Sequence, residues 1–245
     1  MERFTRIRLF LGEEKFKKLQ AASVTVVGLG AVGGHVVEGL ARAGITRLRL
    51  VDFDSVQPSN INRQILALES TLGQPKAQTA MRRVLDINPA CDVEALQIFA
   101  CDETMEQVLE PAPRLLIDAI DSLNPKVQLL TAAYFRRIPI LSSMGAALRT
   151  DPSQIRFGDL FTTRKCPLAR RLRKRLRHNG INEGIECVYS TEEVAFDYQP
   201  PLRDDLAANA FADRGRARRT LGSLPTLTGI FGLCLANRAI LKLAG

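Results

Sequence analysis

The sequence predicts an α/β fold: a Rossmann-like, doubly wound and mostly parallel sheet, with a basic helical excursion and a C-terminal helix. Short runs rich in Val, Ile and Leu alternate along the chain with segments of helical periodicity. A glycine-rich stretch, GLGAVG, stands between the first apolar run and the first amphipathic helix. The 245 residues suffice for one sizeable domain of this class.

The first fifty or so residues predict a strand–helix–strand crossover unit. Residues 24–28 predict a buried parallel strand, because β-branched residues lead directly into a glycine. The following GLGAVGGHVVEGLARAG has apolar residues at helical spacing, and residues 47–52 predict a second strand. A strand, a helix and a second strand in this order form a right-handed crossover.

The same alternation continues to about residue 145. Pro75 lies in the first turn of one expected helix, while Asn124 is expected to cap another, with Pro125 at its first position. We expect helices over 75–87 and 124–137, and strands over 93–98, 114–118 and 138–143.

The pattern loosens after Thr150. A strand over 154–160 is expected at the sheet margin, and 185–190 also predicts a strand. The segment 191–216 is polar and contains prolines, so we expect a mobile loop or crossover. Two helices complete the chain: 167–180, with Leu168, Leu172 and Leu176 on one face and cations elsewhere, and the apolar 224–243, which should pack on the sheet.

Composition favours an intracellular, cytoplasmic protein. No stretch approaches the roughly 20 apolar residues of a membrane span, and the N-terminus lacks the apolar block of a secretory signal. The five cysteines form no CxxC pair, which argues against structural zinc and against a disulfide framework. We therefore expect no membrane, no zinc, and cysteines that mostly pack as small apolar residues.

The formal charge of +8 is unevenly distributed. Eight basic residues and no acidic residue lie between Arg164 and Arg177. A second cluster comprises Arg214, Arg216, Arg218 and Arg219. Charge alone leaves two readings open, a nucleic-acid contact and a solvated face.

Glycines and an aspartate predict a nucleotide site. Gly28, Gly30 and Gly33 form a GxGxxG between a strand and a helix, where backbone can approach phosphate at the helix N-terminus. Asp52 ends the next strand and is placed to accept hydrogen bonds from ribose hydroxyls. These features alone fit an NAD-dependent dehydrogenase equally well.

The loop after Asp52 favours ATP. Arg63 can neutralise phosphate oxygens, and Asn60 and Gln64 can hold ribose and phosphates through neutral hydrogen bonds, whereas a nicotinamide site gains little from them. Lys76 begins a helix, where its ammonium can face phosphate. Asp121, shortly after the strand that ends at Asp118, can hold Mg²⁺. Each of these residues alone could be an ordinary surface charge or cap.

GLGAVG, VDFD, SNINRQ, LGQPKA and DAIDS, in this order and spacing, resemble the ubiquitin-activating-enzyme superfamily, the adenylating fold of ThiF, MoeB and HesA. The resemblance covers residues 1 to about 145. It implies binding of Mg²⁺ and ATP, and transfer of AMP to a carboxylate with release of pyrophosphate. The residues that it implies for the ATP site are Gly30, Ala31, Asp52, Ser59, Asn60, Ile61, Asn62, Arg63, Lys76, Asp121 and Ser122.

The resemblance also implies catalytic roles and an assembly. Arg63, Lys76 and Mg²⁺ on Asp121 would neutralise the charge that gathers on the phosphates. Arg6 matches an N-terminal arginine that in this superfamily usually reaches the phosphates of the partner subunit, which implies a homodimer.

SQIRFGDL, CPLARRLRKRLR, ECVYSTE and LGSLPTLTGIFG resemble the tRNA threonylcarbamoyladenosine dehydratase branch over nearly the whole chain, with 191–216 matching least. The branch implies one adenylating domain over 1–245, with an ATP-binding core in 1–145 and a tRNA-facing part in 146–245. It favours the nucleic-acid reading of the basic helix and leaves open a cysteine-desulfurase or sulfur-acceptor partner. The expected tRNA contacts are Arg170, Arg171, Arg173, Lys174 and Arg177.

The chemistry implied by this branch is dehydration through an acyl-adenylate, which needs positioning and charge neutralisation but no protein nucleophile. Cys187 lies in an expected strand and Cys234 in an apolar helix, so packing explains both better than a thioester does. Two alternatives remain: activation of the C-terminal carboxylate of a ubiquitin-like or sulfur-carrier protein, and an NAD-binding module or scaffold without adenylation.

Overall fold

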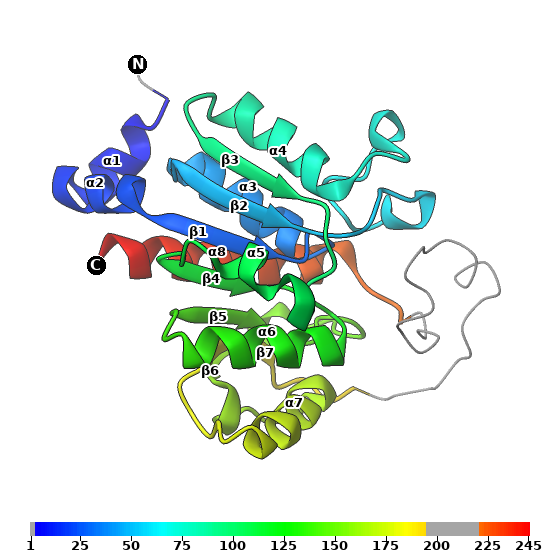
Figure 1. Cartoon of the computed structure of the whole chain (residues 1–245). Coiled ribbons are helices and arrows are strands. Elements are labelled where there is room, and N and C mark those ends of the chain that lie inside the picture. The colour runs from blue at the N-terminus through cyan, green and yellow to red at the C-terminus, as the bar shows by residue number, and fades with distance from the viewer. Residues whose placement is uncertain (1–2, 195–220) are drawn as a thin grey trace.

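Seven strands form one sheet in the order β3-β2-β1-β4-β5-β7-β6 in the computed structural model, which describes residues 3–194 and 221–245 (Figure 1). Neighbouring strands run parallel, except that β6 pairs antiparallel with β7 at one margin. The predicted fold class is confirmed, and so is the marginal strand. The strands are β1 (Ser23–Val27), β2 (Arg47–Val51), β3 (Asp92–Leu96), β4 (Leu115–Asp118), β5 (Ile140–Ser143), β6 (Ile155–Asp159) and β7 (Glu186–Ser190).

Helices cover both faces of the sheet, and each face has its own apolar core. One core joins α3 and α8 to the sheet through residues such as Leu40 and Phe231. The other joins α6 and α7 through residues such as Leu129 and Leu172. The helices are α1 (Thr5–Leu11), α2 (Glu13–Ala21), α3 (Gly33–Ala43), α4 (Lys76–Ile87), α5 (Met105–Leu109), α6 (Leu123–Phe135), α7 (Pro167–His178) and α8 (Pro225–Ala244).

The sheet changes direction of winding between β1 and β4. These two strands are neighbours in space, but their connections lead to opposite sides, from β1 towards β2 and β3 and from β4 towards β5. In open α/β sheets, ligands bind in the crevice outside the carboxyl ends of the strands at such a switch point. The loops that follow β1, β2 and β4 therefore form the place to look for a site.

The start and end of α6 differ from the sequence prediction. The helix begins at Leu123, and its N-cap residue is Ser122, so the prediction that Asn124 caps it was wrong and Pro125 lies in the first turn instead. The helix stops at Phe135 rather than at residue 137. Arg137 adopts a left-handed φ of 57°, which is incompatible with continuing the helix.

The C-terminal helix α8 is more apolar than the sequence analysis expected. Among the described residues, α8 is the one helix that is long and apolar enough to cross a membrane, with a mean hydropathy of 1.4 over its most apolar window. The expectation that no stretch approaches such a span was therefore wrong. More than half of that window is buried, and α8 packs closely on α3, because a Cβ added at Gly232 would lie 2.4 Å from the Val32 carbonyl oxygen. α8 also contacts β4, β5 and β7, as predicted for this segment.

Two N-terminal helices, α1 and α2, were not predicted. α2 buries Phe16 and Leu19 and leads directly into β1, so both helices lie beyond the amino ends of the strands (Figure 1). α1 buries none of its residues. Its short amphipathic pattern is too weak to distinguish from a loop without the contacts that α2 provides.

Candidate nucleotide site and basic helix

The three motif glycines serve different purposes. Gly28 has a φ of 88°, and a Cβ there would lie 2.8 Å from the Ala119 carbonyl oxygen. A Cβ at Gly33 would lie 1.8 Å from the Gly28 carbonyl oxygen, so the turn itself requires this glycine. A Cβ at Gly30 would meet only the Gln64 side-chain amide, at 3.7 Å. The fold therefore does not need a glycine at position 30, whereas a closely approaching ligand does.

Asp52 fastens the glycine-rich turn to the end of β2. One carboxylate oxygen accepts a hydrogen bond from the Leu29 amide at 2.7 Å, and the other accepts one from the Asp54 amide at 2.9 Å. Burial raises the pKa of Asp52 above its ordinary value, while the positive charge of Lys76 and the two amide bonds act in the opposite direction. Each oxygen retains a lone pair, so the carboxylate can also accept hydrogen bonds from ribose hydroxyls.

The loop from Ser59 to Gln64 folds back over the glycine-rich turn. Asn60 is buried, and its side-chain oxygen accepts a hydrogen bond from the Gln57 amide at 3.0 Å. Gln64 is buried beside Gly30. Half-buried Arg63 donates to the Ser59 carbonyl and to the Asn62 side chain, both at 2.9 Å. The loop thus holds the Arg63 guanidinium through its own polar atoms.

Lys76 is buried at the start of α4 and pairs with Asp54, with 3.1 Å between its Nζ and the carboxylate Oδ2. The Lys76 amide also donates to the Asp54 carbonyl at 2.9 Å. The other carboxylate oxygen, Oδ1, is buried and has no hydrogen-bond partner in the described part of the chain. The free carboxylate oxygen can accept one further hydrogen bond, from a water or from a hydroxyl of a ligand.

Asp54 was not singled out from the sequence, although it is the second acid of the quoted VDFD. The motif shows only that a second carboxylate follows the strand. Its pairing with Lys76, which is 22 residues away along the chain, depends on how α4 returns to the sheet.

The loop after β4 carries Asp121 and Ser122 and is held from below by a buried ion pair. Lys126 and Asp118 are both fully buried, and their Nζ and Oδ2 atoms are 2.6 Å apart. The Lys126 Nζ also donates to the Ile120 carbonyl at 2.9 Å. Asp118 accepts further bonds from the Ser142 hydroxyl at 2.6 Å and from the Ile120 amide at 3.0 Å. Sequence reasoning missed Lys126, because a lysine in an amphipathic helix gives no signal that it will be buried.

The carboxyl edge of the sheet thus gathers most of the expected site. It brings together the turn after β1, the loop after β2, the start of α4 and the loop after β4. Asp121 is exposed at this edge. The described residues contain no group of three or more His, Cys, Asp or Glu side chains that could hold a metal ion, so the absence of zinc stays a prediction. Mg²⁺ needs no such group, since one or two carboxylates and substrate phosphates hold it.

Arg6 is the expected site residue that lies elsewhere. It is exposed on α1, which lies beyond the amino ends of the strands and therefore at the opposite edge of the sheet (Figure 1). Leu9 and Phe10 on the same helix are 78% and 76% exposed. The Arg6 of a chain is therefore remote from the carboxyl-edge loops of that chain.

The basic helix α7 buries one apolar face, as predicted, but Ala169 takes the buried position that was expected for Leu168. The buried residues are Ala169, Leu172 and Leu176, whereas Leu168 is only half buried. Burying a leucine side chain completely contributes about 1.5–3 kcal/mol to folding. α7 lies beside α6, where Arg175 donates to the Asn124 side chain at 2.7 Å and Asn179 donates to the Thr131 hydroxyl at 3.0 Å.

The five cations expected to meet tRNA divide into two groups. Arg173 is half buried, and its guanidinium donates to the Thr163 and Leu160 carbonyls at 3.1 and 3.4 Å, so it is bound within the protein. Arg177 is exposed but lies over the Phe161 ring, 5.6 Å from its centroid. The remaining three, Arg170, Arg171 and Lys174, are exposed. The second cluster, at Arg214, Arg216, Arg218 and Arg219, and most of the segment 191–216 lie outside the described residues.

The cysteines behave as packed residues. Cys91, Cys101, Cys166 and Cys187 are buried, and Cys234, which belongs to α8, is half buried against the core. Burial strongly raises the pKa of the Cys187 thiol, and it also raises the pKa of Cys234. A thiol held protonated in this way is a poor nucleophile. Neither residue has the environment of a thioester-forming cysteine.

Comparisons with known proteins match these observations. A family model described as the ThiF family matches residues 2–245. A tRNA threonylcarbamoyladenosine dehydratase of Bacillus subtilis is 36% identical over 248 residues, which cover 99% of this chain and 95% of that protein. The crystal structure of the Escherichia coli tRNA N6-threonylcarbamoyladenosine dehydratase in complex with ATP has a TM-score of 0.86 at 32% identity, covering 98% of this chain and 93% of that one. A molybdopterin-synthase adenylyltransferase of Salmonella typhimurium is 35% identical over 142 residues, which cover 58% of this chain and 55% of that protein.

Proposed function

The chain belongs to the ThiF family, and from this premise we propose that it is an ATP-dependent enzyme that dehydrates threonylcarbamoyladenosine in tRNA. The observation that carries the proposal is the extent of similarity. The dehydratase of Bacillus subtilis is similar over 99% of the chain, whereas the adenylyltransferase that acts on molybdopterin synthase is similar over 58%. Similarity to the dehydratase therefore extends over a part of the chain that similarity to the adenylyltransferase does not reach.

The reaction has two stages. The free carboxylate of the threonylcarbamoyl group attacks the α-phosphorus of ATP, the bond from that phosphorus to the bridging oxygen breaks, and pyrophosphate leaves. The carbamoyl group of the same modification then attacks the acyl carbon, loses a proton, and displaces AMP together with one former carboxylate oxygen. The tRNA has then lost one water, and ATP has been split into AMP and pyrophosphate.

The residues at the carboxyl edge match the needs of this chemistry. The glycine-rich turn admits the nucleotide, and Asp52 accepts from the ribose. Arg63 and Lys76 provide positive charge that is already positioned before the substrate arrives, and such pre-organised charge is the main way to stabilise a phosphoryl-transfer transition state. The expected ATP contacts are Gly28, Gly30, Ala31, Gly33, Asp52, Ser59, Asn60, Ile61, Asn62, Arg63, Gln64, Lys76, Asp121 and Ser122.

Asp121 is the residue suited to hold Mg²⁺. It is exposed at the carboxyl edge, and Lys126 and Asp118 fix the loop that carries it. A single carboxylate with the phosphate oxygens of the nucleotide fits the coordination that Mg²⁺ prefers. The bound ion would neutralise negative charge on the phosphates.

A homodimer explains the position of Arg6. Since Arg6 lies at the edge of the sheet opposite the nucleotide loops, it can act at a nucleotide only if that nucleotide is bound by another copy. The exposed Leu9 and Phe10 on the same helix give a second copy apolar surface to cover. Arg6 of one subunit would then complete the phosphate contacts of its partner.

The remaining assignments concern the tRNA. We assign the whole chain to one adenylating unit, with 1–145 binding ATP and 146–245 facing the tRNA. Exposed Arg170, Arg171 and Lys174 would contact backbone phosphates, because such contacts supply most nonspecific affinity for nucleic acid. We place the enzyme in the cytoplasm, with a cysteine desulfurase or sulfur acceptor as a candidate partner.

The decisive experiment measures nucleoside mass. Purified protein is incubated with ATP, Mg²⁺ and tRNA that carries threonylcarbamoyladenosine. The tRNA is then digested to nucleosides, and their masses are measured by mass spectrometry. The expected product lacks one water, and no product should form without ATP. Unchanged nucleoside mass under conditions that support ATP binding would remove the assignment, and pyrophosphate exchange that depends on a small carrier protein would establish the alternative.

A further inference from the structure

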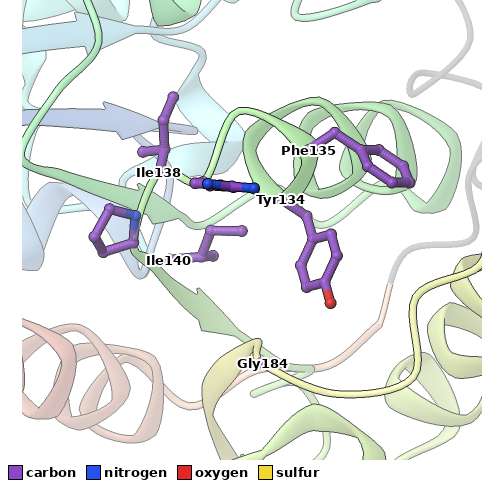
Figure 2. A pocket seen from close by; sticks show the side chains of 7 residues that line it. Tyr134, Phe135, Ile138, Ile140 and Gly184 are labelled. Carbon is purple, nitrogen blue, oxygen red and sulfur yellow. The ribbon is translucent and has the colours of Figure 1, made fainter.

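A hollow of about 500 Å³ opens at the amino edge of the sheet, far from the nucleotide loops. It lies between the C-terminal end of α6 and the loop that precedes β7, with Tyr134 and Ile140 beside it and Gly184 closing one side (Figure 2). Its lining residues are Tyr134, Phe135, Arg137, Ile138, Pro139, Ile140 and Gly184. The hollow is large enough for a planar base-sized group.

The rim of the hollow is held in place by the protein itself. One oxygen of Asp159 accepts hydrogen bonds from the Gly184 and Ile185 amides at 2.6 and 3.2 Å, and the other accepts from the Phe161 amide at 2.7 Å. The negative charge of Asp159 is therefore compensated by three backbone donors. Tyr134 packs directly beneath Gly184, since a Cβ added at that glycine would lie 3.3 Å from the ring. The site is formed before any ligand arrives.

The lining combines aromatic surface with a cation. Phe135 is 63% exposed at the outer margin, and its ring meets the Tyr134 ring edge to face, with centroids 5.7 Å apart. Arg137 is exposed and has a left-handed backbone, and its side chain has no hydrogen bond or ion pair among the described residues. An aromatic platform beside an unpaired guanidinium is the combination that stacks a nucleobase and attracts its phosphate.

One chain of contacts links the basic helix α7 to the rim of the hollow. Arg177 of that helix lies over Phe161, and the Phe161 amide shares the Asp159 carboxylate with Gly184 on the rim. α6 is 13 residues long and runs from the nucleotide loops to the hollow, a distance of about 20 Å at about 1.5 Å per residue. A nucleotide in the hollow therefore cannot be the one that reacts.

From these contacts we propose that the hollow at Tyr134, Phe135 and Arg137 binds an unpaired nucleotide of the tRNA, remote from the modified adenosine. This inference rests on the proposed function only for the identity of the RNA. It assigns α7 and the hollow to one continuous RNA-binding surface that runs from the carboxyl edge to the amino edge. Because the contact is remote from the chemistry, it should contribute to substrate affinity and leave the chemical step alone.

The test uses three single variants of the full-length protein. Phe135→Ala removes exposed ring surface, and Arg137→Asn removes the cation but keeps a residue that tolerates a left-handed backbone. The matched control is Arg136→Asn, because Arg136 is the neighbouring cation, does not line the hollow, and pairs with Glu110 at 3.8 Å. Steady-state kinetics with modified tRNA, and binding of labelled unmodified tRNA by fluorescence anisotropy, are measured for each.

Both hollow variants should raise KM for tRNA and the dissociation constant by about tenfold, in line with the loss of one stacked base. The kcat and the KM for ATP should remain at the wild-type values, and Arg136→Asn should change none of these quantities. Wild-type affinity for tRNA in both hollow variants would overturn the inference. So would a shift of the dimer equilibrium in light scattering without a change in tRNA affinity, because the surface would then be a contact between copies.

The two proposals fail separately. If the wild-type protein binds tRNA but never dehydrates it, the proposed function falls, while the anisotropy of the variants still decides the inference. If the wild-type protein dehydrates tRNA and the variants bind it normally, only the inference falls.

Discussion

Two lysine–aspartate ion pairs lie at the carboxyl edge of the sheet: Lys126 of α6 with Asp118 at the end of β4, and Lys76 of α4 with Asp54 in the loop after β2. The two pairs differ in burial and in how many of their polar atoms have hydrogen-bond partners. Lys126 and Asp118 are fully buried, 2.6 Å apart, and surrounded by further hydrogen bonds. Lys76 and Asp54 are 3.1 Å apart, and the Asp54 side chain is 25% exposed with its buried Oδ1 unpaired. The first pair belongs to the fold, and the second leaves bonding capacity for a ligand.

The difference shows how one edge of a sheet can be rigid and reactive at once. The buried pair holds both the amide and the carbonyl of Ile120, the residue directly before Asp121. The Lys76 ammonium has three donors and one hydrogen-bond acceptor, Asp54, among the described residues, so donors remain for a second acceptor. We therefore expect the Lys126–Asp118 pair to affect mainly stability and Lys76 to affect mainly turnover.

The largest expected effect is on stability. Lys126→Met leaves the Asp118 carboxylate buried without its partner, which should lower the free energy of unfolding by about 3–5 kcal/mol. Urea denaturation followed by circular dichroism measures it. The double variant Asp118→Asn/Lys126→Met should recover part of the loss, because no buried charge then remains. A loss below about 1 kcal/mol in the single variant would mean that the pair does not hold this loop.

The second effect is on turnover. Lys76→Met should lower kcat by about 10²–10³-fold, the cost of removing one donor that stabilises transition-state charge. Its loss of unfolding free energy should be clearly smaller than that of Lys126→Met, because Asp54 can be hydrated. Asp121→Ala should go further and abolish turnover, while the melting temperature is largely preserved. Single-turnover assays alongside thermal melts measure both. Equal destabilisation by Lys76→Met and Lys126→Met would erase the distinction between the two pairs.

The third effect separates two glycines of one motif. Gly30→Ala should raise KM for ATP by about tenfold without loss of stability, because its Cβ meets no fold atom closer than 3.7 Å but intrudes on a ligand. Gly33→Ala should instead destabilise the protein by about 1–3 kcal/mol or more, since its Cβ would clash with the Gly28 carbonyl. Calorimetric titration with ATP and thermal melting distinguish them. Normal ATP affinity in Gly30→Ala would place the nucleotide elsewhere.

The smallest expected effect is the loss of unfolding free energy on removing an ion pair that lies outside both loops. Glu186 at the start of β7 receives hydrogen bonds from Arg238 and Lys242 of α8, at 2.5 and 2.9 Å. Burial opposes ionisation of this carboxyl, but the two cations outweigh burial and lower its pKa. Its contribution is therefore present above the unfolded-state pKa and is lost as the pH falls through the folded-state pKa. Glu186→Gln should cost about 0.5–1 kcal/mol at neutral pH, and the difference from wild type should vanish in acid.

Local patterns in the sequence were enough for most of the fold. Alternation of β-branched runs with amphipathic helices identified every strand of the sheet to within about two residues. The central strands β4 and β5 are buried on both faces and therefore carry an unbroken apolar signature, whereas the marginal strands β3 and β6 are partly exposed and more polar. The limits of α6 were misjudged for a local reason. Asn124 and Pro125 are favourable near a helix start but do not decide which of several adjacent residues begins it.

The sequence by itself determined the individual strands and helices, the glycine-rich turn and the types of side chain on each carboxyl-end loop, since these depend on neighbours along the chain. Only the tertiary structure decided that Lys76 meets Asp54, that Lys126 is buried with Asp118, and that Arg6 lies at the far edge of the sheet. It also decided that Arg173 is bound within the protein while its neighbours Arg171 and Lys174 remain open. Burial and pairing arise from contacts between residues distant in the chain, and residue type and spacing do not encode them one by one.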